Sequence, residues 1–175
     1  MVGYGELACR LLIGIVFAAS AFSKLRSRSE YRAFAQWLGG LPLPGPFRGA
    51  PAAAAVAATE AAIVVLLIPP VTAAIGLTLS AVTLAAFASG TFVTVRTGTA
   101  TPCRCFGASD SPMSAWHVAR DALLALLAAA GASSAGSLAH SAGGIALSLA
   151  IAVTVAVPVV LFDDLLSVFR LPASR

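Results

Sequence analysis

The chain has 175 residues, of which 59% are hydrophobic and only 10% are charged, and its mean hydropathy is +0.93. About a quarter of the residues of a soluble domain are charged, so this composition excludes an ordinary soluble protein. The net charge of +4 could suggest a nucleic-acid partner, but the basic residues gather beside one apolar segment, as at a cytoplasmic membrane face. We therefore expect an integral protein of the lipid bilayer and no nucleic-acid partner.

Charged residues are absent from two long stretches, one between Glu60 and Arg96 and the other between Asp121 and Asp163. A helix of about 20 apolar residues crosses a bilayer, so both stretches can hold membrane helices. The apolar runs predict spans over about 7–25, 50–68, 71–95, 116–131 and 144–162. The predicted fold class is an all-α, multi-pass transmembrane helical bundle of about five spans.

The first predicted span, 7–25, has Arg10 near one end and Lys24 near the other, and both side chains can reach an interface. The connection that follows, 26–48, is basic. Its large apolar residues recur at helical spacing, which favours a short helix lying in the membrane interface: these are Tyr31, Phe34, Trp37 and Leu38.

The second predicted span carries Glu60 near its middle. A carboxyl group inside a span is energetically expensive unless it is paired, protonated or faces a cavity. Glu60 is therefore either a proton-site or quinone-site group or the buried partner of a cation. Three cations of the apolar segments are candidates for that pairing, Arg10, Lys24 and Arg120, and the sequence does not choose between them.

The loop over 96–115 contains Cys103 and Cys105, one residue apart. Such a pair can form a small-ring disulfide, whose strain raises its reduction potential, so it exchanges readily. Arg104 between them favours the thiolate, which is the reactive form. Two other interpretations stay open: incidental loop residues, or a soft-metal site that includes His117, although two thiolates fall short of a structural zinc shell.

The fourth predicted span opens with Trp116, which suits the interfacial aromatic belt. Arg120 lies about one turn further on and can point back towards the cysteine loop. Either this is an anchored helix start, or His117 or Arg120 stabilises a thiolate. The third cysteine, Cys9, stands alone in the first span, and we expect an apolar core residue there rather than a redox partner.

Charge also predicts sidedness. Five spans place the connections 26–48 and 96–115 on the same side of the membrane. The first connection is rich in Lys and Arg, whereas the loops after the second and fourth spans carry no formal charge. The positive-inside rule therefore places the cysteine loop in the cytoplasm. Cytosolic thiols are usually kept reduced, which conflicts with a stable disulfide in this loop.

Several segments resemble the methylamine utilisation protein MauE family, within the wider DoxX-like group of small membrane proteins. Residues 10–14 and 20–25 resemble the DoxX-like opening, and Glu60 sits where that group carries an acidic residue in its second span. Residues 103–107, Cys-Arg-Cys-Phe-Gly, resemble the Cys-x-Cys-Phe-Gly loop of MauE. The resemblance extends over roughly 7–130.

The resemblance implies a multi-pass protein of the inner (plasma) membrane. Residues 1–131 would form the MauE/DoxX-like core of four spans with the Cys-x-Cys loop at 103–105, and 132–175 an additional transmembrane helix with a loop and a short polar tail. It also implies thiol–disulfide redox work in the maturation of extracytoplasmic proteins, such as the β-subunit of methylamine dehydrogenase, with a thioredoxin-like partner and a thiol-containing client.

In that function the redox pair would be Cys103 and Cys105. The supporting polar groups would be Arg10, Lys24, Glu60 and Arg120, to which the local chemistry adds Arg104 and His117. Two alternatives remain: a non-catalytic subunit or scaffold of an oxidoreductase complex, and a soft-metal-binding membrane protein. In the preferred interpretation we expect neither a metal nor a cofactor. A quinone would be compatible with redox work, but no motif indicates a site for one.

Overall fold

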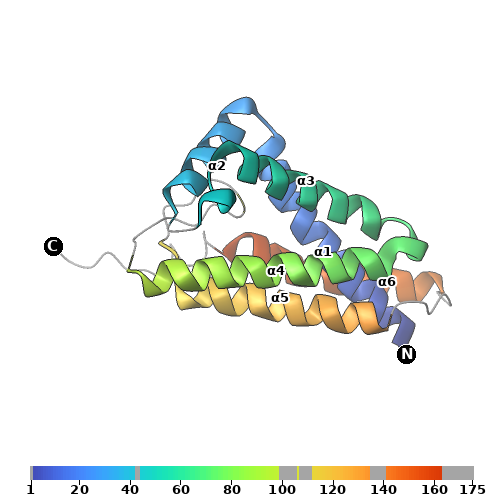
Figure 1. Ribbon diagram of the computed structural model, residues 1–175. Coiled ribbons are helices and arrows are strands. Elements are labelled where there is room, and N and C mark those ends of the chain that lie inside the picture. The colour runs from blue at the N-terminus through green and yellow to red at the C-terminus, as the bar shows by residue number, and fades with distance from the viewer. Residues whose placement is uncertain (1, 42–43, 99–105, 107–111, 135–140, 163–175) are drawn as a thin grey trace.

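A computed structural model of the chain describes residues 2–41, 44–98, 106, 112–134 and 141–162 (Figure 1). The regular elements within these ranges are helices, which confirms the all-α fold class. Within the described ranges lie six α-helices, α1 (Val2–Leu25), α2 (Arg28–Gly40), α3 (Gly49–Leu67), α4 (Ala73–Arg96), α5 (Ala115–Ser133) and α6 (Ala142–Val160), with 3₁₀ turns at Gly45–Phe47 and Pro70–Thr72.

Four segments of the described chain are long and apolar enough to cross a membrane: Tyr4–Leu25, Gly49–Leu67, Pro70–Arg96 and Ala142–Val160. They correspond to four of the five predicted spans. The remaining predicted span, 116–131, falls on α5. This helix has 19 residues, the same length as α3, but it contains two charged residues, Arg120 and Asp121, near its start. The chain is thus a multi-pass helical membrane bundle.

Helix α1 is central, because it contacts each of the other five α-helices. In Figure 1 it runs between the corner made by α2 and α3 and the side-by-side pair of α4 and α5. Its buried apolar residues follow helical spacing and form the core with residues of α3, α4, α5 and α6. The α1 contribution is Leu12, Ile13, Val16 and Phe17.

Helix α6 packs on α1 through small side chains, Ser148, Ala152 and Ala156, which are its buried residues. Small residues let two membrane helices approach closely. Its large side chains instead remain exposed on the bundle, as expected for a helix that faces lipid. These are Ile145, Leu147, Leu149, Ile151, Val153, Val155 and Val157.

Helix α2 packs on α3, where Phe34 and Leu38 form a second apolar cluster with Ala53. The helix predicted from the spacing of the aromatic residues is therefore confirmed. Ser27 caps α2 by accepting a hydrogen bond from the backbone N–H of Glu30 at 3.2 Å, as serine commonly does at a helix N-terminus.

The connections after α1 and after α4 lie at the same end of the bundle, as the sequence predicted. From the second of them, Phe106 packs against the main core, and Met113 packs against the α2–α3 cluster. We call this the cysteine-loop end. Helices α1, α4 and α6 finish there, whereas α3 and α5 begin there (Figure 1).

At the opposite end, α1 and α6 meet at Gly144. A Cβ atom at this position would lie 1.9 Å from Cε1 of Tyr4. The Tyr4 ring is held in place because its hydroxyl is 3.1 Å from Oγ of Ser141 and accepts a hydrogen bond from the Ser141 N–H at 3.2 Å. The ring would have to leave these partners to make room, so the close approach requires glycine.

We therefore expect Gly144→Ala to lower the free energy of unfolding by about 1–3 kcal/mol, the usual effect of overpacking. The measurement is unfolding of the purified protein in detergent. Gly143→Ala is the matched control, because a Cβ atom there meets nothing within 4 Å. Equal stability of the two variants would show that the Tyr4 contact does not limit this interface.

Candidate functional site

The centre of the site is a buried ion pair between α1 and α3. Lys24 Nζ lies 3.0 Å from Glu60 Oε1, and the two side chains are 4% and 0% exposed. Ser20, one turn before Lys24 on α1, joins the pair through its hydroxyl. This hydroxyl donates to Glu60 Oε1 at 2.9 Å and accepts from Lys24 Nζ at 2.7 Å.

This geometry decides which cation pairs with the membrane carboxyl group. Lys24 lies in the last turn of α1, near the cysteine-loop end, and its ammonium group also stands 5.0 Å from the ring centre of Phe34 in α2. Oε2 of Glu60 is buried and has no hydrogen-bond partner among the described residues. The ammonium group of Lys24 thus neutralises the carboxylate through Oε1.

Arg10 lies at the other end of α1 and does not form this pair. Its Nε donates to the carbonyl oxygen of Leu67 at 2.6 Å, and its Nη2 donates to that of Ile68. These are the last carbonyls of α3, which carry the negative end of the helix dipole and lack partners within the helix. Arg10 therefore caps α3 and fastens it to α1.

A second buried ion pair lies within α5. Arg120 donates from Nε to Asp121 Oδ1 at 3.0 Å, and Nη2 lies 2.9 Å from the same oxygen. The guanidinium also contacts two aromatic rings, with its Cζ 5.1 Å from the ring centre of Phe106 and 5.5 Å from that of Phe162. A guanidinium over ring faces at such distances is stabilised by cation–π attraction.

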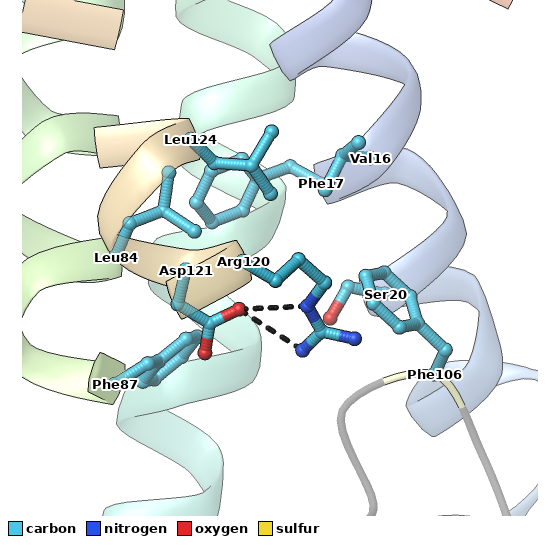
Figure 2. A pocket seen from close by; sticks show the side chains of 9 residues that line it. All are labelled: Val16, Phe17, Ser20, Leu84, Phe87, Phe106, Arg120, Asp121 and Leu124. Carbon is cyan, nitrogen blue, oxygen red and sulfur yellow. Dashed lines mark hydrogen bonds and ion pairs between the residues drawn. The ribbon is translucent and has the colours of Figure 1, made fainter. Parts of the chain in front are cut away.

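A small cavity lies beside the Arg120–Asp121 pair. Figure 2 shows Arg120, Asp121 and Ser20 among its lining side chains, with Phe106 closing it towards the cysteine loop. The other described residues that line it are apolar. Its volume is about 20 Å³, enough for about one water molecule. Ser20 belongs to this cavity and to the Lys24–Glu60 pair.

His117 is buried, but it forms part of a helix cap. Its Nδ1 accepts from the Ser114 N–H at 3.1 Å and lies 2.9 Å from Ser114 Oγ, which closes a capping box at the start of α5. Because Nδ1 accepts, the neutral ring carries its hydrogen on Nε2. The ring also meets Phe162 edge-on, with 5.6 Å between centroids.

Cys103, Arg104 and Cys105 lie outside the described residues, so the predicted redox pair and the predicted metal alternative stay predictions. Phe106, the next residue, is described and anchors the loop against Arg120. Cys9 is partly buried at the opposite end of the bundle, where its Cβ would be 3.1 Å from a Cβ at Gly131.

Comparison with known proteins shows one relationship. The family model described as methylamine utilisation protein MauE matches residues 3–134, more than half of the chain. The chain belongs to this family. No curated protein and no solved structure matches it. The MauE region runs from α1 to the end of α5, so it includes both ion pairs and the cysteine loop, while α6 lies beyond it.

Sequence reasoning on this MauE family member missed three residues of the site. Ser20 precedes Lys24 by four residues, and this i, i+4 spacing on a helix could have indicated their contact. Asp121 directly follows Arg120 in the sequence and was assigned no partner there, yet it is the buried partner of Arg120. No pattern in the sequence indicated a role for Phe162, because its ring reaches Arg120 only through the packing of α6 in the bundle.

Lys24→Met should lower the free energy of unfolding by about 3–5 kcal/mol, since it leaves the Glu60 charge buried without its partner. Adding Glu60→Met should recover most of that loss, because an apolar pair avoids the desolvation penalty. Both are measured by unfolding in detergent.

The control for this pair is Arg26→Met, which removes an exposed i, i+4 pair with Glu30 at 2.7 Å. Such surface pairs contribute at most about 1 kcal/mol. A Lys24→Met variant no less stable than Arg26→Met would contradict the importance of the buried pair.

Proposed function

We propose that this protein carries out thiol–disulfide exchange with the pair Cys103 and Cys105, in support of the maturation of extracytoplasmic proteins. The observation that carries the proposal is the anchoring of Phe106 over the buried Arg120 guanidinium at 5.1 Å. Adjacent Cα atoms are about 3.8 Å apart, so this contact ties the backbone next to Cys105 to a buried cation.

A cation near a cysteine favours the thiolate, which is the nucleophile in exchange. Arg120 is suited to this because a guanidinium stays charged in any protein environment. Asp121 and the two aromatic rings hold it in one orientation at the cysteine-loop end. Lys24 adds a second buried positive charge nearby, although Glu60 neutralises it.

The exchange has two steps. One thiolate of the pair attacks a partner disulfide, forms a mixed disulfide and releases one partner sulfur as a thiolate. The second cysteine then attacks the mixed disulfide and releases the other partner sulfur. Two thiols of this chain lose two electrons to become a disulfide, and the partner disulfide gains them to become two thiols. The reverse sequence oxidises a client instead.

The partner of this exchange is proposed to be a thioredoxin-like protein, and the client an extracytoplasmic protein with thiols. Family membership favours a client linked to methylamine utilisation. The β-subunit of methylamine dehydrogenase is the proposed example of such a client. The proposed location is the inner (plasma) membrane. No bound cofactor enters the proposed exchange.

Replacing a single cysteine tests the two-step exchange. In a Cys9→Ser background, Cys103→Ser or Cys105→Ser should leave one attacking thiol that cannot be resolved, so a mixed disulfide with the thioredoxin-like partner accumulates. The double replacement should abolish it. Non-reducing electrophoresis after acid quenching reads out the adduct. An adduct that persists in the double variant would refute the assignment.

Labelling of intact cells with a membrane-impermeant maleimide, again in a Cys9→Ser background, measures the side of the loop. The charge pattern predicts that Cys103 and Cys105 react only after lysis. Labelling of intact cells that occurs only after prior reduction would mean an outward-facing disulfide. This result would overturn the predicted sidedness and favour direct oxidation of extracytoplasmic clients.

A further inference from the structure

We propose that a groove at the junction of α1 and α2 binds the headgroup of an anionic phospholipid, whose phosphate is held by Arg28 and Arg32. The groove has a volume of about 460 Å³ and is lined by Leu25, Ser27, Arg28, Tyr31 and Arg32. It lies where α2 turns back from the end of α1 (Figure 1). This site is independent of the proposed thiol–disulfide exchange and uses none of its residues.

The two arginines of the groove form a pair of like charges. They stand four residues apart on α2, so they are neighbours on the helix surface, where like charges destabilise a helix. Glu30 lies between them in the sequence, but its carboxylate is taken by Arg26, whose Nη2 is 2.7 Å away. Neither Arg28 nor Arg32 has an ion-pair or hydrogen-bond partner for its side chain within the described part of the chain. An anion between them would therefore replace repulsion by attraction.

A phosphate group matches this pair in charge and in geometry. A guanidinium presents a planar fork of N–H donors that binds two phosphate oxygens at once. Both arginines are exposed, so their side chains are accessible to a ligand. Tyr31 provides a fixed wall, because its ring packs against the α2–α3 cluster and its hydroxyl donates to the carbonyl oxygen of Ala50 at 3.1 Å. The volume of the groove also falls within the range of small-ligand sites, about 300–1,000 Å³.

The position of the groove selects a lipid as the source of this phosphate. Leu25 is the last residue of α1 and of the apolar segment Tyr4–Leu25, so the groove begins where the membrane span ends. Phe22 and Leu25 are 69% and 54% exposed, and their spacing of three residues places them on one side of the helix. An acyl chain can lie along this apolar strip while its headgroup enters the groove. Basic residues directly after a span, on an amphipathic helix, are typical of anionic-lipid recognition.

The opposite face of α2 explains what a bound headgroup would stabilise. Phe34 and Leu38 of this helix are buried against α3, and the Phe34 ring stands 5.0 Å from the ammonium group of Lys24. A lipid held by Arg28 and Arg32 would keep α2 at the membrane surface in this packing. Because a ligand that binds only the folded protein stabilises it by mass action, the lipid should also raise the unfolding temperature.

The test titrates the purified protein in a non-ionic detergent with phosphatidylglycerol, which is anionic, or with phosphatidylcholine, which has no net charge. Native mass spectrometry gives the Kd of each bound lipid. We expect wild type to bind phosphatidylglycerol more tightly. Arg28→Gln and Arg32→Gln should each weaken that binding about 5-fold, and the double variant about 25-fold, as expected for basic residues near an anionic headgroup. Binding of phosphatidylcholine should not change.

Arg96→Gln is the matched control. It removes the same charge at the same end of the bundle, because Arg96 is the last residue of α4, but this side chain lies over the Phe92 ring at 4.9 Å and does not line the groove. It should bind phosphatidylglycerol like wild type. Equal weakening by Arg96→Gln and by Arg28→Gln would mean general charge attraction without a site, and it would overturn the inference.

An excess of inorganic phosphate, added at constant ionic strength, separates a lipid site from a site for a free anion. We expect phosphatidylglycerol to stay bound, and its displacement would overturn the choice of a lipid. Equal affinity of wild type for the two lipids, or a double variant that binds like wild type, would also refute the site. Thermal unfolding with each lipid checks that the variants are folded. If the double variant does not fold, the two single variants decide.

Discussion

The pairing of Lys24 with Glu60 at membrane depth is the constraint on which much of this structure depends. Neither charge could remain alone between α1 and α3, so the two side chains must meet. Their contact at 3.0 Å fixes the register of the two helices. Arg10 fixes the same two helices at their other end, through the final carbonyls of α3. These two polar contacts therefore hold α1 and α3 together at two separate points along α1.

The polar residues are concentrated at one end of the bundle for a related reason. Helix α5 begins at the cysteine-loop end, so the first turns that carry Arg120 and Asp121 lie there, while its later turns are almost purely apolar. Packing of α5 along α4 and α1 shelters these charges. Near this end, Val159 of α6 packs against the core, and just beyond the helix the Phe162 ring lies against Arg120.

Membership of the MauE family and the geometry of the site rest on different observations. The family model rests on the sequence of 3–134, whereas the geometry rests on the two buried ion pairs and on Ser20, which contacts one pair and lines the cavity beside the other. Phe106 packs over the buried Arg120 guanidinium at the cysteine-loop end of the bundle.

The sequence by itself determined the class of fold and most helix positions, because a span needs about 20 apolar residues and charges interrupt such runs. It also identified Glu60, Lys24 and Arg120 as the polar residues that require an explanation. Only the tertiary structure decided their partners: Lys24 rather than Arg10 for Glu60, Asp121 for Arg120, and a helix cap for His117. Hydropathy records how deep a residue lies but not which helix faces it. That choice depends on helix rotation and crossing, which arise from packing across the whole bundle.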